Sequence, residues 1–468
     1  MAIKKHRMTD SPRRLALTIL ALSGLFAAIY NAFLPLHGDE AYYWLWSHRL
    51  QAGYYDHPPM IALLIALSNL LSEAEWGVRL VNVLAMSVAG WVVFVLLESL
   101  RDARAGLWGV ILFVSVVLVH AGYTVVTTDS PLILFWSLTL LYTYRVLTRG
   151  RTSDFLLTGL YAGAMMLSKY TAVLYVLALL LFLLLRRRDL FADRRTWMAA
   201  GAALAVIAPL LWWNFEHDWI SFLFQLHHGG GKDHIMWNWV TELIGAQFGV
   251  FTPVFAAVLF YALVKEKLFV RNDALFFLAL MTVTPLLFFL YKSLHTHIEL
   301  NYTAPAYISG TVLTAYFLAS RGMKKTFVAG VALALFLSLA ARAALLWWLP
   351  VVQDRMYGNK EAVAMLDRHR HADDALYADH LTLAALITYY SPERPEVRIP
   401  TPTRYSQYDM WDDGTPYRPG LYLASEPMEK KLRMRFGRIE CIDTLTVQRG
   451  LHGTKTYSLY RVADPKAR

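Results

Sequence analysis

The chain has little cysteine and little charge. Its 468 residues include one cysteine, Cys441, and charged residues make up 17% of the sequence. A single cysteine excludes an internal disulfide and a zinc site built from cysteines. We predict that Cys441 is a buried residue of a strand. We also find no internal repeat and no low-complexity tract.

Hydrophobic residues, in contrast, make up 56% of the chain. They arrive in blocks long enough to cross a bilayer, which takes about 20 residues. We therefore predict an all-α polytopic membrane protein with about eleven transmembrane helices. The predicted segments are residues 15–36, 76–100, 105–126, 129–147, 154–168, 171–185, 196–215, 246–264, 273–291, 302–320 and 326–349. Segments 154–168 and 171–185 are short, so one kinked element that enters and returns is the alternative there.

Lysine and arginine predict the orientation. With a cytoplasmic N-terminus, basic clusters fall on the inside, whereas the short outside loops hold few basic residues, with Arg79 just within a helix. This distribution satisfies the positive-inside rule. It also accounts for the net charge of +10 without a nucleic-acid partner, because anionic membrane lipids attract the basic loops. The inside clusters lie within residues 4–14, 101–104, 145–151, 186–195, 265–271 and 321–325, and the outside basic residues are Arg49, Lys169, Lys232 and Lys292.

The apolar blocks end at Pro350, which predicts two domains. Residues 1–350 form the transmembrane domain, with a first outside loop at 37–75, and residues 351–468 form a small α/β domain outside. In this second domain four stretches predict strands and two predict helices. The strands are "DALYADH", "GLYLAS", "RIECIDTLTV" and "KTYSLYRVA", and the helices are "LTLAALITYY" and "MEKKLRMRF".

Candidate chemical groups gather on the predicted outside face. Ionisable groups at the ends of membrane helices are costly to bury, so their convergence indicates a shared functional site. The candidates are Asp39, Glu40, Tyr55, Asp56, His57, Asp129, Lys169, Glu216, Asp218, Lys292, His295, His297, Glu299 and Asn301.

Several of these residues have a structural alternative. Asp39 precedes a helix-like stretch and is a candidate N-cap, although capping and catalysis are compatible. Asp129, before Ser130 and Pro131, is a second candidate cap. The aromatics within residues 42–46 suit an interfacial belt or a sugar platform. The histidines of 227–234 resemble metal ligands, but a flexible loop explains them equally well.

Six motifs in order carry a family resemblance. They are "GDEAYYWLWSHRL…GYYDHPPMIALLIAL", "VRLVNVL", "TTDSPLILFW", "LSKYTAVL", "WWNFEHDWISFLFQL" and "NYTAPAY", with a weaker echo at "YSQYDMW". Together they resemble bacterial members of glycosyltransferase family 39, a group similar to protein O-mannosyltransferases, aminoarabinose transferases of lipid A and rhizobial galacturonosyltransferases. The resemblance implies a GT-C fold in the bacterial inner membrane. It also implies a polyprenyl-phosphate sugar as donor and an active site facing the periplasm.

The resemblance further implies roles for the candidates. Asp39 would be the general base, with Glu40 as a helper or metal ligand and Asp129 as a second carboxylate. No cofactor is required, and the alternative is a divalent cation held by Asp39, Glu40 and Asp129. Cations near the leaving phosphate would stabilise its charge, and we favour Lys169, a lone lysine between apolar segments. The other candidate phosphate ligands are Arg79, Lys292, His295 and His297, with Arg342 as a weaker candidate; substrate-binding candidates are Tyr55, His57, Glu216, Asp218, Glu299 and Asn301.

The substrate is less well specified by the sequence. Where aminoarabinose transferases have Lys-Pro-Pro in the first loop, this chain has Asp56-His57-Pro58-Pro59, which leaves the donor sugar open. Lipid A, core oligosaccharide, another polyprenyl-linked glycan and protein all remain as acceptors. A transporter or flippase of lipid-linked sugars is the main alternative function, but such proteins carry ionisable groups near the bilayer midplane and often internal symmetry. A sensor or assembly scaffold is the third.

Overall fold

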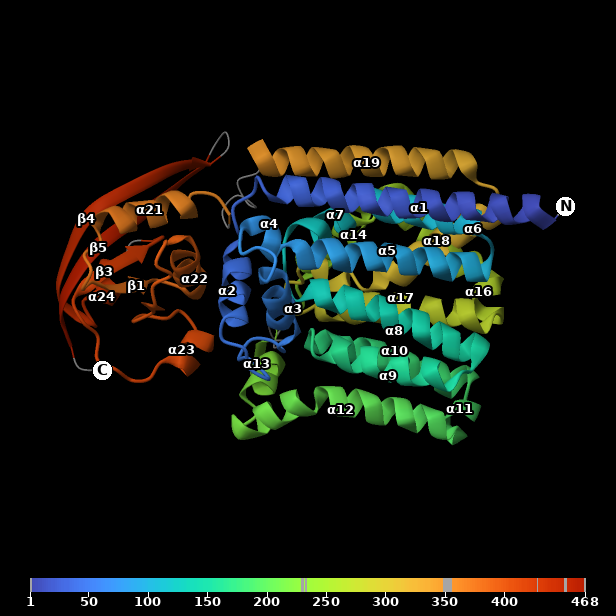
Figure 1. Ribbon diagram of the computed structural model, residues 1–468, viewed down its shortest axis with the longest axis horizontal. Helices are drawn as coiled ribbons and strands as arrows, with labels where there is room; N and C mark the ends of the chain where they lie inside the picture. Colours follow the sequence, from blue (N-terminus) through green and yellow to red (C-terminus); the bar gives the residue numbers. More distant parts are fainter. Residues whose placement is uncertain are drawn as a thin grey trace.

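The chain forms a bundle of long helices with a β-sheet domain at one end (Figure 1). The structure is a computed structural model that describes residues 2–228, 231, 234–347, 356–426, 428–449 and 453–466. The N-terminus lies at the end of the bundle far from the sheet (Figure 1). The predicted domain boundary at 350/351 falls outside the described residues.

The bundle consists of helices of very different lengths. Most run side by side along its long axis, whereas α2 lies across their ends beside the C-terminal part (Figure 1). The elements are α1 (Ala2–Asn31), α2 (Gly38–Ser47), α3 (Met60–Asn69), α4 (Glu75–Val78), α5 (Leu80–Leu100), α6 (Ala103–Ser115), α7 (Val117–Thr124), α8 (Asp129–Arg149), α9 (Thr152–Met166), η1 (Tyr170–Ala172), α10 (Val173–Arg186), α11 (Asp189–Ala192), α12 (Arg194–Glu216), α13 (Ile220–His228), α14 (Trp237–Val250), α15 (Pro253–Lys265), α16 (Lys267–Arg271), α17 (Asp273–Lys292), η2 (Leu300–Thr303), α18 (Ala306–Ser320) and α19 (Lys324–Trp347).

Among the described residues, six helices are long and apolar enough to cross a membrane, or eight if each of two bent pairs is one span. The predicted number of eleven therefore stays a prediction. The two bent pairs correct the predicted continuous segments: 105–126 bends by 65° between α6 and α7, and 246–264 is broken by a 107° bend between α14 and α15. At the second break Thr252 has a φ of 64°, and Pro253 begins the new helix.

Segments 154–168 and 171–185 form two separate helices, α9 and α10, joined by Lys169 and η1. The helices α11 and α16, which adjoin the basic clusters 186–195 and 265–271, lie at the end of the bundle away from the sheet (Figure 1). The basic clusters and the candidate site residues therefore lie toward opposite ends, as the sequence predicts.

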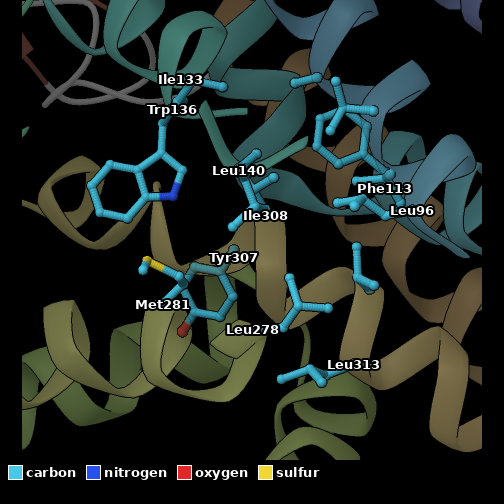
Figure 2. Packing of buried hydrophobic residues seen from close by; sticks show 14 of the residues in the cluster. Leu96, Phe113, Ile133, Trp136, Leu140, Leu278, Met281, Tyr307, Ile308 and Leu313 are labelled. Atoms are coloured by element: carbon cyan, nitrogen blue, oxygen red, sulfur yellow. The ribbon is translucent and has the colours of Figure 1, made fainter. Parts of the chain in front are cut away.

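Large apolar side chains fill the centre of the bundle. Figure 2 shows Trp136 of α8, Met281 of α17 and Tyr307 of α18 close together in this cluster. The Tyr307 hydroxyl donates to Oε1 of Gln247 at 2.8 Å, which ties α18 to α14. In lipid, helices associate through close packing and interhelical hydrogen bonds of this kind.

The C-terminal part is a small α/β unit. Its five-stranded sheet has the order β2-β1-β3-β5-β4, parallel at β2-β1-β3 and antiparallel from β3 to β4. The elements are α21 (Asn359–His369), β1 (Ala375–Ala378), α22 (Leu381–Tyr390), β2 (Val397–Arg398), α23 (Gln407–Trp411), β3 (Gly420–Ala424), α24 (Glu429–Leu432), β4 (Phe436–Arg449) and β5 (Gly453–Pro465).

All four predicted strands and the helix at 381–390 are confirmed. The predicted helix "MEKKLRMRF" is wrong beyond Leu432, because the chain turns there and Phe436 already begins β4. Cys441 lies in β4 as predicted, but its side chain is exposed rather than buried. The strand that holds it, β4, is at the edge of the sheet.

Helix α22 packs directly against α2 and fixes the C-terminal unit on the bundle. At their contact, a Cβ at Gly38 would lie 2.6 Å from Cβ of Thr382, so the start of α2 requires glycine. The Tyr390 hydroxyl also accepts the Leu36 N–H at 2.8 Å. The first residues of α2 are thus held from two sides.

Candidate active site

Asp39 lies in the first turn of α2 and is not its cap. The cap is His37, whose Nδ1 accepts the N–H of Asp39 at 3.1 Å, while Glu40 Oε2 accepts the N–H of His37 at 2.8 Å. The alternative of Asp39 as N-cap is therefore wrong. Its side chain is 39% exposed, with Oδ2 3.6 Å from His37 Nδ1. The helix start favours a negative charge at this position.

Glu40, in contrast, is fully buried and its oxygens are occupied. Arg79 donates from Nε to Oε1 at 2.9 Å and from Nη2 to Oε2 at 2.6 Å, and the Val126 N–H donates to Oε1 at 2.8 Å. The remaining Arg79 donors bind the carbonyls of Asn31, Leu34 and Pro35 at 2.7–3.0 Å. All five N–H groups of Arg79 are used. This geometry favours a structural role for Glu40 and Arg79 over the predicted metal and phosphate contacts.

Asp129, Lys169 and Asn301 come together from three distant segments. Lys169 Nζ donates to both Asp129 oxygens at 2.8 and 2.9 Å, and Asn301 Nδ2 donates to Oδ2 at 2.5 Å. Lys169 also lies 4.5 Å from the ring centre of Tyr302. Both members of the ion pair are about nine-tenths buried, with 10% of the Lys169 and 7% of the Asp129 side chain exposed. Asp129 is the first residue of α8, so the alternative of Asp129 as its cap is wrong: the N-cap is Thr128, which makes no side-chain cap hydrogen bond.

Tyr43 connects Asp39 with this ion pair. Burial raises the pKa of the Tyr43 hydroxyl well above its usual range, and the nearby charges of Asp39, Asp56 and Asp129 raise it further. Three carboxylates therefore act electrostatically on one buried hydroxyl. In addition, the Val126 N–H donates to Glu40 and so holds the start of α2 against the segment that precedes Asp129. Val126 is three positions before Asp129 in the sequence. The predicted convergence of Asp39 and Asp129 at one end of the bundle is thus present.

Asp56 is the third carboxylate, and the C-terminal unit reaches it. Its Oδ2 accepts the Tyr42 hydroxyl at 2.9 Å and its Oδ1 accepts Arg404 Nη1 at 2.7 Å. The neighbouring Gln407 donates its N–H to the Tyr42 hydroxyl at 3.0 Å and accepts the Tyr55 N–H at 2.8 Å. Residues 404–407 therefore brace the loop in which Asp56 and His57 lie.

The Asp56–Arg404 pair predicts a pH-dependent stability. Burial raises the pKa of Asp56, although Arg404 and the Tyr42 hydroxyl lower it in part. A carboxyl with a raised folded-state pKa stabilises the fold below its unfolded pKa of about 3.9, and this contribution is lost as the pH rises through the folded pKa. Arg404→Gln removes the main compensation. We expect its destabilisation to grow between about pH 4 and pH 7, to about 1 kcal/mol, since Arg404 is half-exposed.

Thermal midpoints measured over this pH range check the expectation. The matched control is Asp56→Asn combined with Arg404→Gln, in which the pH-dependent part of the difference should vanish. A destabilisation by Arg404→Gln that is the same at every pH would contradict the pairing.

The remaining candidates lie around rather than in this cluster. Tyr55 packs on Phe224 and Tyr405 at 4.6 and 4.9 Å, and the His57 ring lies 6.2 Å from that of Tyr43. His297 pairs with Glu242 at 3.2 Å, and Arg342 Nε donates to His120 Nδ1 at 2.8 Å. The structure thus does not bring His297 or Arg342 to Asp129. Exposed Glu216 and Asp218 lie at the end of α12, and exposed Glu299 precedes η2. Lys292 is the last residue of α17, and His295 lies between α17 and η2.

The carboxylates do not form a metal site in the described part of the chain. No group of three His, Cys, Asp or Glu side chains there is arranged to hold an ion. Asp129 is held by a lysine and an asparagine, and Glu40 by an arginine. Two of the three ligands in the predicted alternative of a cation on Asp39, Glu40 and Asp129 therefore already bind other side chains, and no step is assigned to a metal.

The sequence reasoning missed Tyr43, Tyr302, Arg404 and Gln407 as members of the site. The first two were visible only as aromatic residues next to candidate motifs. Arg404 and Gln407 are separated from their partners by more than 340 residues, and the weak tail motif "YSQYDMW" was the available signal.

The fold and the site define the class of protein as one with a GT-C arrangement. In this arrangement a structured first loop lies over the ends of the helices, with carboxylates beneath it. Residues 56–213 match the family model described as dolichyl-phosphate-mannose-protein mannosyltransferase. The chain is 28% identical over 297 residues to the lipid A galacturonosyltransferase RgtD of Rhizobium johnstonii, and the match covers 60% of each protein. The chain thus matches less than two thirds of that relative's length.

Solved structures agree in fold. The crystal structure of ArnT from Cupriavidus metallidurans in the apo state matches with a TM-score of 0.69 at 13% identity, over 96% of this chain and 98% of that one. The same protein bound to undecaprenyl phosphate matches with a TM-score of 0.67 at 15% identity, over 94% and 97%. These findings confirm the predicted resemblance to glycosyltransferase family 39 and the GT-C fold of this multi-pass membrane protein.

Proposed function

We propose that this protein is an integral membrane glycosyltransferase of the bacterial inner membrane that moves a sugar from a polyprenyl-phosphate donor to an acceptor at the periplasmic face. One observation carries the proposal: the Val126 N–H donates to Glu40 Oε1 at 2.8 Å, so the first turn of α2, which holds Asp39, lies against the segment that leads to the buried Asp129–Lys169 pair. A lipid donor has its tail among the helices and its sugar phosphate at this level. The glycosyltransferases among the relatives support the same assignment.

The reaction needs a base and a cation, and the site holds both. Asp39 accepts the proton of an acceptor hydroxyl, whose oxygen forms a bond to C1 of the donor sugar. The bond from C1 to the phosphate oxygen breaks, and polyprenyl phosphate leaves. Lys169 stabilises the charge on that phosphate. Asp129 and Asn301 hold Lys169 in place, since they bind each other and the carboxylate binds the ammonium.

Lys169→Ala is expected to weaken donor binding. A desolvated charge-to-phosphate contact contributes about 1.5–3 kcal/mol, so the dissociation constant for polyprenyl phosphate should rise by about 10–100-fold. The matched control is Lys265→Ala, a lysine at the end of α15 where the basic loops lie. A titration that gives Lys169→Ala the same affinity as the unchanged protein would remove Lys169 from the phosphate site.

The orientation has its own test, for which the chain supplies the probe. Cys441 is exposed in β4 and is the single cysteine of the sequence. We expect it to react with a membrane-impermeant maleimide in intact spheroplasts, because the C-terminal unit faces the periplasm in our proposal. A variant that combines Cys441→Ser with Arg188→Cys, placing the thiol in a basic loop, should react only after lysis. The opposite labelling pattern would invert the topology and the site with it.

The acceptor and the donor sugar are identified by transfer. The purified protein in detergent is incubated with a panel of polyprenyl-phosphate sugars and with lipid A as first acceptor, since the matched relative acts on lipid A by its name. We expect release of polyprenyl phosphate that depends on the acceptor and on one donor sugar. A flippase would move such lipids across a vesicle membrane and release no polyprenyl phosphate from any donor.

A further inference from the structure

A cavity lies between α2 and the C-terminal unit. Its volume is about 740 Å³, within the range of about 300–1,000 Å³ of small-molecule sites. Helix α2 contributes Trp44, His48 and Arg49 to its wall, and the C-terminal unit contributes Arg394 and a group of aromatics on α23. The cavity is therefore lined from both parts of the chain.

This cavity lies on the other face of α2 from the candidate active site. At 3.6 residues per turn, Tyr43 lies nearly above Asp39, whereas Trp44 is about 140° and His48 about 180° around the helix from Asp39. Trp44 and His48 line the cavity, and Asp39 and Tyr43 do not. A molecule in the cavity would thus be separated from the reacting groups by the helix itself.

Two arginines in the wall lie over tryptophan rings. The guanidinium of Arg394 lies 5.1 Å from the ring centre of Trp44, and that of Arg49 lies 4.8 Å from that of Trp411. Arginine bound to an aromatic ring is still able to donate its N–H groups to carboxylate or phosphate oxygens. Their ion pairs within the protein, with Glu73 for Arg394 and with Glu396 at 3.5 Å for Arg49, involve exposed or partly exposed carboxylates.

Three polar atoms of the wall also have no hydrogen-bond partner among the described residues. They are the indole nitrogens of Trp44 and Trp411 and the hydroxyl of Tyr408, all buried. Indole nitrogens only donate, so they require acceptor oxygens. The four acids of the wall each have a partner within the protein: Asp409 completes the capping box of α23, Asp412 pairs with Arg398 at 3.1 Å, Glu396 pairs with Arg49 at 3.5 Å, and Asp413 accepts the Thr415 N–H at 2.9 Å.

We propose that this cavity binds an anionic oligosaccharide, a short glycan that carries carboxylate or phosphate groups. The arginines bind the anionic groups, and the aromatic residues of the wall provide rings for the sugars to pack against. The site is separate from the transfer reaction, and its ligand binds whether or not Asp39 acts as base.

Binding is tested by calorimetry on the purified full chain with two probes of equal length. Trigalacturonic acid is the anionic probe and maltotriose is the neutral one. We expect saturable binding of trigalacturonate, and binding of maltotriose at least about tenfold weaker, because loss of charge-assisted hydrogen bonds costs about tenfold or more. Equal affinity for both probes, or no saturable binding of either, would overturn the proposal.

Variants locate the binding. The combination of Arg49→Gln with Arg394→Gln should weaken trigalacturonate binding by about tenfold or more, whereas Arg438→Gln, an exposed arginine of β4 outside the cavity wall, should not. Asp39→Asn should bind trigalacturonate normally even if it has lost transfer. Unchanged binding by the double variant, or loss of binding in Asp39→Asn, would contradict the site. Thermal midpoints confirm that each variant is folded.

Discussion

Asp39→Asn is expected to lower the rate of sugar transfer by about 10²–10⁴-fold, the usual contribution of a general base. Asparagine keeps the size of the side chain but cannot accept the proton of the acceptor hydroxyl. Folding should survive, because the cap of α2 is His37 and the other capping bond comes from Glu40. The measurement is transfer rate and thermal midpoint in one preparation.

Asp102→Asn provides the matched control for this change. Asp102 caps α6 through the Ala105 N–H at 2.8 Å, in the short α5–α6 connection. Asparagine caps helices about as well as aspartate, so both stability and transfer should be retained. Near-normal turnover of a stable Asp39→Asn protein would sink the assignment of the base. The role would then pass to Asp129, because the Glu40 side chain has no exposed surface whereas 7% of the Asp129 side chain is exposed.

Glu40→Gln is expected to destabilise the protein by about 3–5 kcal/mol. Breaking a buried ion pair by removing one partner leaves the other charge uncompensated, and Arg79 has no exposed surface. Arg79 also holds the carbonyls before α2, so the first loop should loosen as well. The main effect of Glu40→Gln should therefore be on the free energy of unfolding rather than on the rate of sugar transfer. The free energy of unfolding in detergent, measured with a denaturant, checks it.

Glu75→Gln is the control in the same region. Glu75 is partly exposed and its nearest cation, Lys360, lies 3.9 Å away, so its loss should cost less than about 1 kcal/mol. A Glu40→Gln protein of normal stability with reduced transfer would contradict the structural role. It would restore the interpretation of Glu40 as a helper of the base.

The sequence predicts the membrane helices well because their signal is local. Long apolar runs, basic clusters and the strands of the C-terminal unit all depend on neighbouring residues, and these predictions match α1, α5, α8 and most later helices. The breaks before α7 and α15 were missed, since an apolar run gives no sign of a bend except Pro253. The edge position of β4, and with it the exposure of Cys441, depends on strand order, which sequence alone does not define.

The division of labour within the site depends on contacts between distant segments. Asp39 and Glu40 are adjacent and identical in kind, and only the position of Arg79 makes the second a buried structural group. Likewise, Lys169 was singled out correctly as unusual, but its bond to Asp129 spans 40 residues and that of Asn301 to Asp129 spans 172. The bracing of Asp56 by Arg404 could not be inferred from either domain alone.

The location of the donor is the central claim, and photo-crosslinking tests it most directly. A benzophenone amino acid replaces Tyr302, whose ring lies 4.5 Å from Lys169 Nζ, and in a second protein it replaces Trp411 on the far side of α2. A radiolabelled polyprenyl-phosphate sugar is added to each protein, and the mixture is irradiated. We expect capture at position 302, competed by unlabelled polyprenyl phosphate, and none at position 411. Capture at 411, or no competed capture at 302 in a folded protein, would contradict the proposed site.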